Sequence, residues 1–211
     1  MIYQKEQIMR DVRVALDLNM SSEALVGAGD IDTLSLDQVI ESKIEEGVRR
    51  VHLSAPVWML ESGHHFGDSL FWGDGGCGWV LLPDDFLRLV TFRMSDWERG
   101  VHRAYACTDP MYARQRSRYK GIRGTCQKPV CVIAVRPEGR VLEFYSCKSR
   151  QAEVSEGVYV PEPAFDRHGG MDISERCYRA VVYRVAALVA ASFSDAAKAQ
   201  LYEGLSNDSL G

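Results

Sequence analysis

The sequence predicts an α+β fold in which a four-helix bundle, made of two N-terminal and two C-terminal helices, carries a β-rich insertion between the helix pairs. Apolar residues recur at helical spacing near both ends of the chain, whereas its middle holds short apolar runs separated by turn residues. Helices so far apart in the sequence must pack together to bury their apolar faces. The expected division is a helical bundle from 1–60 and 172–205, a Gly-rich aromatic loop at 61–78, a β-rich insert at 79–171 and a flexible tail at 206–211.

Two amphipathic helices are expected in the first 60 residues. From Ile2 to Leu18, apolar side chains fall three and four positions apart. The segment from Met20 to Thr33 is rich in Ser, Gly and Asp, which predicts a loop. The second helix is expected to begin at Ser35, because Gln38 completes a capping box, and to end near Ser54, ahead of a proline.

The middle of the chain changes from glycine-rich to strand-like. Glycines interrupt the stretch from Glu61 to Gly78, so we expect a loop held in place by its aromatic side chains. Four later runs have the short apolar character of strands, namely WVLLP, FLRLVTFRM, KPVCVIAV and RVLEFYS. The last two are joined by Arg136 to Gly139, whose Pro and Gly suit a tight hairpin connection.

Helical periodicity returns after a Pro-rich crossing from Gly157 to Phe165. Asp172 and Glu175 form a second predicted capping box, and the helix behind them is apolar over much of its circumference. This pattern predicts a central place in the bundle. Ser194 is expected to cap a shorter helix through Leu205, which the polar tail follows.

Composition narrows the class of protein. A formal net charge of -4 argues against a protein that coats nucleic acid, so any DNA contact must come from a local patch. No apolar run approaches the roughly 18 residues that span a bilayer, and the charged N-terminus differs from a signal peptide, which predicts a cytoplasmic product. The six cysteines lack the spacing of zinc or redox motifs and are predicted to be free thiols.

A metal site is considered at adjacent histidines and then set aside. His64 and His65, with Asp68 and Asp74 nearby, offer imidazole and carboxylate ligands. Neighbouring side chains of an extended segment point in opposite directions, however, and no second His pair stands at helical spacing. The sequence therefore predicts no metal site.

Catalytic motifs are incomplete. The LPDD sequence from Leu82 to Asp85 resembles the first half of a nuclease motif, but the second half is missing, because four residues separate Glu143 from Lys148. The glycine-rich GDGGCG lacks the Lys and Ser or Thr of a phosphate-binding loop, and no Gly-x-Ser-x-Gly elbow occurs. We therefore expect a non-enzymatic protein with no catalytic residues and no cofactor.

One segment, 112–124, is strongly basic and reads YARQRSRYKGIRG. Three interpretations of it stay open, namely contact with DNA phosphates, pairing with acidic side chains of a neighbouring subunit, or a solvated surface. Exposed aromatic side chains could add to a subunit interface. The candidate interface residues are Phe71, Trp72, Tyr112, Arg114, Arg116, Arg118, Lys120 and Arg123.

The run GWVLLPDDFLRLVTFRMSDWERGV, from Gly78 to Val101, resembles the head-to-tail connector proteins of tailed bacteriophages, specifically adaptors of short-tailed and crAss-like phages related to tail tubular protein A. In that family, two N-terminal helices precede a β insert that begins with a strand and a Leu-Pro-x-Asp-Phe-Leu-type turn, and two C-terminal helices follow. The expected layout of this chain is similar over nearly its whole length. The segment from Gly63 to Trp79 departs from the family pattern.

The resemblance implies a virion structural protein, a head-to-tail adaptor that forms an oligomeric, usually dodecameric, ring beneath the portal. The implied partners are further copies of the chain, the portal protein, tail or nozzle proteins, and double-stranded DNA that passes through the channel without sequence-specific binding. No membrane is involved, and the implied location is the neck or tail of the virion, after synthesis in the host cytoplasm. Another neck or tail-completion protein, or a DNA-binding protein using residues 112–124, are the alternatives.

The C-terminal residues have an implied role of their own, because in related adaptors this segment reaches into the portal. Here the segment comprises Gly204, Leu205, Ser206, Asn207, Asp208, Ser209, Leu210 and Gly211. Disordered ends can become ordered on a partner. Deleting these residues is therefore expected to spare folding and weaken portal docking.

Overall fold

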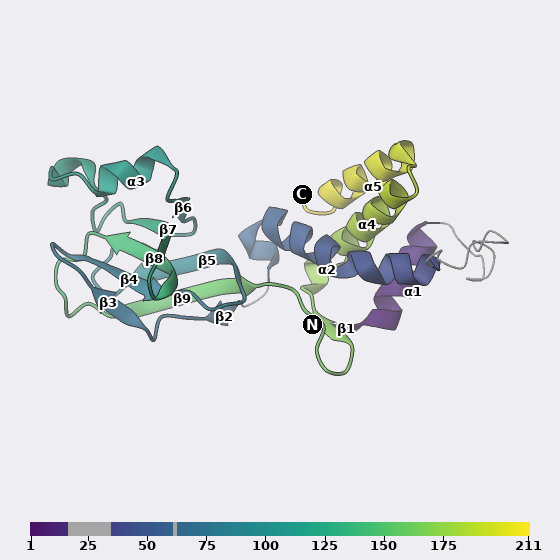
Figure 1. The fold of residues 1–211 in the computed structure, drawn as a ribbon, viewed down its shortest axis with the longest axis horizontal. Coiled ribbons are helices and arrows are strands. Elements are labelled where there is room, and N and C mark those ends of the chain that lie inside the picture. The colour runs from purple at the N-terminus through teal and green to yellow at the C-terminus, as the bar shows by residue number, and fades with distance from the viewer. Residues whose placement is uncertain (17–34, 61–62) are drawn as a thin grey trace. The chain divides into compact units, whose positions relative to one another are not determined.

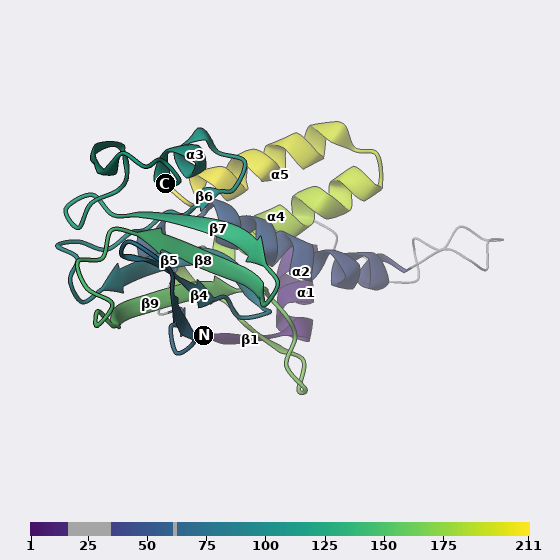
Figure 2. The same cartoon turned by 60° about the vertical axis from the view of Figure 1, so that its left-hand side comes forward.

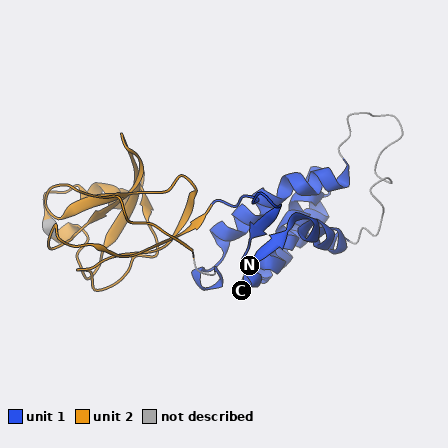
Figure 3. Cartoon of the chain, turned by 90° about the horizontal axis from the view of Figure 1, so that it is seen from below, with its two compact units in different colours: residues 1–61, 162–211 blue, residues 62–161 orange. Residues whose placement is uncertain are grey.

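The computed structural model describes residues 1–16, 35–60 and 63–211. Over these residues the fold is α+β, with 5 α-helices and 10 strands in three sheets, as Figure 1 shows. The α+β class is therefore as predicted. The chain divides into two compact units, a helical unit of residues 1–61 and 162–211 and a β unit of residues 62–161 (Figure 3).

Helices from both ends of the chain build the helical unit and share one apolar core. Its elements are β1 (Ile2–Gln4), α1 (Lys5–Ala15), α2 (Leu36–Ser54), the 3-10 turn η2 (Val57–Met59), β10 (Gly170–Asp172), α4 (Glu175–Ser192) and α5 (Ala196–Asp208). Helix α4 packs against α1, α2 and α5, and Figure 1 shows α4 and α5 side by side. Strands β1 and β10 pair antiparallel beside the helices.

The start of α2 is as the sequence predicts. The Ser35 hydroxyl accepts a hydrogen bond from the Gln38 backbone N–H at 3.3 Å, and the Gln38 side chain accepts one from the Ser35 N–H at 2.8 Å. The helix ends at Ser54. In its middle, Gly47 allows close packing, because a Cβ at this position would lie 2.5 Å from Val185 Cγ2 of α4.

Three other helix boundaries differ from the expectation. Residues 2–4 form β1, so α1 begins only at Lys5. Asp172 lies in β10, and Ser174 stands at the N-cap of α4 without a side-chain capping bond, so the predicted second capping box is wrong. Asp195, rather than Ser194, caps α5 by accepting a hydrogen bond from the Lys198 N–H at 3.0 Å. The loop expected at 20–33 lies outside the described residues.

Two antiparallel-rich sheets form the β unit. Its elements are β2 (His64–His65), β3 (Leu70–Trp72), β4 (Cys77–Leu81), β5 (Phe86–Met94), β6 (Tyr105–Ala106), α3 (Pro110–Gln115), the 3-10 turn η3 (Lys120–Ile122), β7 (Val130–Arg136), β8 (Gly139–Tyr145) and β9 (Val154–Pro161). The three-stranded sheet has the order β2-β9-β5, and the five-stranded sheet has the order β3-β4-β8-β7-β6. Figure 2 shows β7, β8 and β4 running beside one another.

Aromatic side chains from both sheets fill the core of the β unit. Phe92 of β5 lies 5.9 Å from Phe144 of β8, between ring centroids, and Trp97 contacts both rings edge-on. The four predicted strands correspond to β4, β5, β7 and β8. The predicted hairpin is also present, because β7 and β8 pair from Arg136 and Gly139 outward.

Two segments in which the sequence predicts no strand do contain strands. The stretch 61–78, expected as a loop, holds β2, β3 and the start of β4. The expected crossing from Gly157 to Phe165 begins inside β9, and the β unit ends at Pro161 rather than at 171. Pairing with distant segments stabilises these strands, β2 and β5 with β9 and β4 with β8, and local composition does not reveal it.

Candidate functional site

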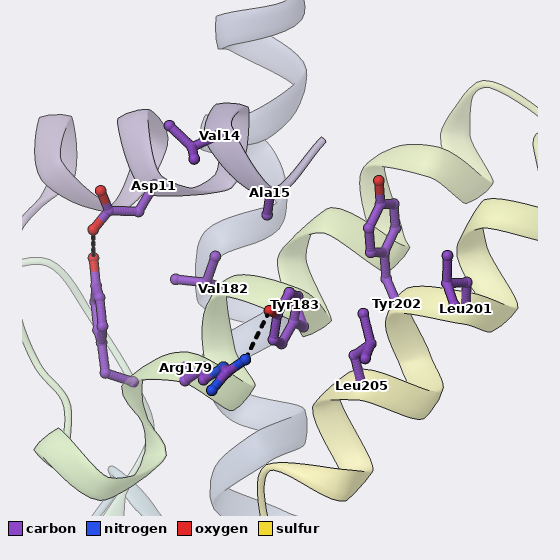
Figure 4. A pocket seen from close by; sticks show the side chains of 10 residues that line it. Asp11, Val14, Ala15, Arg179, Val182, Tyr183, Leu201, Tyr202 and Leu205 are labelled. Carbon is purple, nitrogen blue, oxygen red and sulfur yellow. Dashed lines mark hydrogen bonds between the residues drawn. The ribbon is translucent and has the colours of Figure 1, made fainter. Parts of the chain in front are cut away.

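The helical unit carries an apolar recess of about 550 Å³ between α1, α4 and α5, which we call the helical recess. Figure 4 shows Val14 and Ala15 of α1 on one side of the recess and Leu201 and Leu205 of α5 on the other. Val14 is 67% exposed and Leu201 is 59% exposed. Exposed apolar side chains around a hollow are typical of a binding surface.

Two tyrosines of α4 border the helical recess. The Tyr178 hydroxyl donates a hydrogen bond to Asp11 Oδ2 at 2.6 Å, and its ring stacks on Tyr3 with centroids 3.9 Å apart. Burial is the main cause that raises the pKa of the Tyr178 phenol, and this hydrogen bond is the second. Arg179 donates to the Tyr183 hydroxyl at 3.3 Å (Figure 4). The border therefore combines aromatic rings with the polar groups of Asp11 and Arg179, and tyrosines of this kind are common at protein interfaces.

The predicted C-terminal tail is not a free end. Residues 204–208 lie in α5. The buried Ser206 hydroxyl donates to the Ala180 carbonyl at 2.9 Å, and Asn207 Oδ1 accepts from Arg184 at 2.7 Å. Leu210 is buried in the core of the helical unit. The expectation of a flexible tail at 206–211 is therefore wrong, because these side chains pack against α4.

The two aromatic candidates of β3 point to opposite faces of the five-stranded sheet. Phe71 is partly exposed and stacks on Trp79, with centroids 5.8 Å apart. Trp72 contacts the core residue Phe144 edge-on at 5.4 Å. Only Phe71 therefore remains a candidate for an outside contact.

A charged network crosses the outer face of the same sheet. Arg136 lies 3.8 Å over the Trp79 ring and donates to Glu143 Oε1 at 2.8 Å. The Tyr145 hydroxyl donates to the other oxygen of the Glu143 carboxylate. Burial and this hydrogen bond raise the pKa of Tyr145. Both carboxylate oxygens of Glu143 thus accept hydrogen bonds within the fold, which favours a structural role.

The basic segment 112–124 covers α3 and η3, where Lys120 begins η3. Tyr112 packs on the outer face of the five-stranded sheet. The guanidinium groups mostly contact their own segment. Arg116 and Arg118 stack on Tyr112 and Tyr119, each 5.0 Å from the ring centroid. Arg114 donates to Met111 Sδ at 3.7 Å, and Arg123 donates to the Ser117 carbonyl. Arg114, Arg116 and Arg118 are nevertheless exposed, whereas Arg123 is half-buried.

The candidate metal and nuclease residues make no cluster. His64 and His65 are consecutive in β2, and the structure, over its described residues, contains no group of three or more His, Cys, Asp or Glu side chains placed to hold a metal ion. Asp85 accepts a hydrogen bond from the Tyr159 hydroxyl at 2.8 Å. Burial and this bond raise the pKa of Tyr159 to about 12.

The sequence matches no protein-family model and no curated protein. In the described parts of the chain, no helix has both the length and the apolar character needed to cross a membrane.

Two charged recesses of the β unit were missed by the sequence analysis. The basic recess, of about 490 Å³, is lined by Arg99, His102, Arg103 and Lys128. The acidic recess, of about 450 Å³, is lined by Asp68, Glu153 and Glu156 together with His65. A signal for the first was available, because eight of the chain's 25 Lys and Arg residues, but only one of its 29 Asp and Glu residues, lie between positions 99 and 128.

Proposed function

We propose that this chain is a non-enzymatic virion structural protein, a head-to-tail adaptor of a tailed bacteriophage that forms a ring beneath the portal and surrounds the DNA channel. The observation that carries the proposal is the layout of the chain. Helices from both ends share one core, and the β unit is inserted between α2 and α4. This is the order of elements that the resemblance of Gly78–Val101 to connector proteins implies.

In this proposal α1, α2, α4 and α5 form a four-helix bundle with α4 at its centre. Helix α4 supports the arrangement, since its buried residues lie on several sides of the helix and it contacts each of the other three. Arg184 joins α4 to α5 by donating to Glu203 at 2.5 Å. Such a rigid helical unit would suit a ring subunit that must keep its shape while DNA passes.

The proposed partners are further copies of the chain in a dodecameric ring, the portal protein, and tail or nozzle proteins. Double-stranded DNA would pass through the ring without sequence-specific binding, and the protein would lie in the neck or tail of the virion after synthesis in the host cytoplasm. The net acidic subunit supports loose passage, because a strongly basic lining would hold DNA phosphates.

The helical recess is the proposed portal-docking surface, in place of a flexible tail. Exposed apolar side chains on a rigid element give a docking site that needs no ordering on binding. The candidate residues 204–211 would then contribute through the exposed side of α5, which includes Gly204 and Asp208.

Negative-stain imaging of the purified protein, alone and mixed with cognate portal rings, tests the adaptor function. The expected result is a ring or an added collar on the portal. Leu201→Asp, which places a charge in the helical recess, should abolish the collar, whereas the matched change Val135→Asp, at an 80% exposed residue of the β unit, should not. A chain that stays monomeric and does not bind the portal at any concentration would contradict the proposal.

A second candidate function is DNA binding through residues 112–124, favoured by the exposed side chains of Arg114, Arg116 and Arg118. Fluorescence anisotropy with a DNA duplex at increasing salt separates it from the adaptor. Steeply salt-dependent affinity that disappears in an Arg116→Ala, Arg118→Ala variant would favour DNA binding. Another neck or tail-completion protein is distinguished by association with tail components but not with the portal.

A further inference from the structure

The basic recess is built on backbone that is held firmly in place. Val101 exchanges two backbone hydrogen bonds with Phe92 of β5, at 2.8 and 2.9 Å. Lys128 lies in a tight turn closed by two backbone hydrogen bonds with Thr125. The Glu98 N–H donates to the Cys126 carbonyl at 3.1 Å and joins the two segments. The positive groups of the recess are therefore carried by preorganised backbone.

The carboxylates of the described residues do not neutralise the charges of this recess. Arg99, Arg103 and Lys128 are exposed, and none of them makes an ion pair with a carboxylate of the described residues. The nearby Glu98 side chain accepts a hydrogen bond from Gln127 at 2.8 Å and does not line the recess. A concave group of cations with no ion-pair partner among the described residues, in a protein of negative net charge, indicates an anionic ligand.

The acidic recess has the opposite charge and a similar size. Asp68, Glu153 and Glu156 are exposed, and likewise none of them forms an ion pair with any described residue. The chain thus presents, on one unit, both a cationic hollow and a carboxylate cluster that could satisfy it.

The two recesses lie at opposite edges of the three-stranded sheet. The acidic recess follows β2, where the Phe66 N–H donates to the Gly157 carbonyl of β9 at 3.0 Å. The basic recess lies beyond β5, the strand on the other side of β9, where Val101 pairs with Phe92. Two different patches on opposite edges are what a head-to-tail contact between identical subunits requires.

We infer that the basic recess of one copy receives the acidic recess of the next copy, so that Arg99, Arg103 and Lys128 pair with Asp68, Glu153 and Glu156 across a head-to-tail subunit contact. The inference deepens the proposed ring and rests on it for closure, but the contact itself can be measured without the portal. Charge complementarity favours a second copy over DNA, since DNA would give the unpaired acidic recess no role.

Sedimentation velocity of the full chain at low and high salt tests the contact. We expect concentration-dependent association that weakens with salt. The variants Arg99→Ser with Arg103→Ser, and Glu153→Gln with Glu156→Gln, should each associate at least roughly tenfold more weakly. The matched control Arg167→Ser with Arg176→Ser, which removes two exposed arginines outside both recesses, should associate like the native chain.

Mixing the two neutralised variants gives the sharpest readout, since each retains one intact recess. The mixture should form complexes that stop at two copies, which also demonstrates that both variants are folded. In a mixture of isotopically light and heavy native chains, carbodiimide should join Lys128 of one copy to Glu153 or Glu156 of another. A native chain that stays monomeric and forms no such cross-link would overturn the inference. Association that neither variant changes would overturn it as well.

The outcome can be separated from that of the adaptor test. A portal collar that forms equally with both neutralised variants would leave the adaptor function standing and overturn the recess contact. Salt-sensitive association of the chain without a collar on the portal would support the recess contact and contradict the adaptor function. Loss of duplex binding in the Arg99→Ser, Arg103→Ser variant, with no self-association of the native chain, would identify DNA as the ligand instead.

Discussion

At the scale of single residues, His52 makes the helical unit sensitive to acid. This residue is buried in the last turn of α2, and burial lowers its pKa below the ordinary value of 6.5, more than Asp172 raises it. The unfolded chain therefore binds a proton at a higher pH than the folded chain does. The contribution of His52 to the free energy of unfolding should be constant at pH values above 6.5 and fall as the pH drops below 6.5 toward the pKa of the folded state.

Urea denaturation at about pH 7.5 and about pH 5.5 measures this effect. His52→Gln should reduce the loss of stability between the two, because the variant has no imidazole to protonate. His102→Gln, at an exposed histidine, is the control and should leave the loss unchanged. An equal loss in His52→Gln would show that other groups cause the acid sensitivity.

The thiols should differ in reactivity, because the thiolate is the reacting form. Of the six free cysteines, Cys107 is exposed. Burial raises the pKa of Cys77, Cys126, Cys131 and Cys147, and Cys177 is fully buried. A disulfide reagent should therefore label one thiol per native chain quickly and all six after denaturation. Cys107→Ser should remove the fast phase, and a second fast thiol would contradict this order.

Residue-level prediction succeeds where the determining contacts are local. Ser35 and Gln38 stand three positions apart and bond to each other, so the sequence predicts their capping box correctly. Asp172 and Glu175 have the same spacing, but Asp172 pairs with Ile2 in a sheet between the two ends of the chain. That pairing is invisible in the local sequence.

At the scale of elements, the last turns of α5 should be needed for stability. Deleting residues 204–211 removes Leu210 from the core and leaves Arg184 without Asn207. The expected loss in the free energy of unfolding of the helical unit is about 3 kcal/mol, from lost apolar burial and an unsatisfied buried donor. Far-UV circular dichroism during urea denaturation measures it.

Removal of Gly211 alone is the control for this deletion, because this residue is exposed and follows the last buried side chain. It should have little effect. A full deletion as stable as the native chain would restore the flexible tail that the polar sequence indicates.

Glycine content was the misleading signal for elements of the β unit. Gly75 and Gly76 do form a turn with positive φ, at 70° and 77°. The strands on either side, β3 and β4, are nevertheless paired with each other, and β4 is also paired with β8. Strand pairing at long range thus overrides the local preference for a loop, whereas β5, β7 and β8 are apolar enough to be predicted from sequence.

At the scale of the whole molecule, the charge pattern in sequence only partly indicates the candidate contacts. The contiguous run 112–124 is obvious in the sequence, yet its arginines mostly contact their own segment. Arg99 and Lys128 are nearly thirty positions apart and line one recess only because both segments are fixed by backbone hydrogen bonds. Such convergence depends on the fold and cannot be seen from spacing.

The division into two units should be visible in unfolding. The core of the helical unit and the core around Phe144 share no residues, so each unit has its own apolar driving force. Differential scanning calorimetry should therefore resolve two transitions. Ile44→Ala, in α2, should lower the free energy of unfolding of the helical unit by about 2 to 5 kcal/mol. Only the transition of that unit should therefore move to a lower temperature.

Phe144→Leu, in β8, is the matched change and should lower only the other transition, since it opens a cavity among Phe92, Trp97 and Trp72. If each substitution shifted both transitions equally, the two cores would unfold as one cooperative body. Selective shifts would instead mean that the β unit can loosen without loosening the helices. In the proposed ring, the β unit could then adjust to a neighbouring copy while the helical unit keeps its structure.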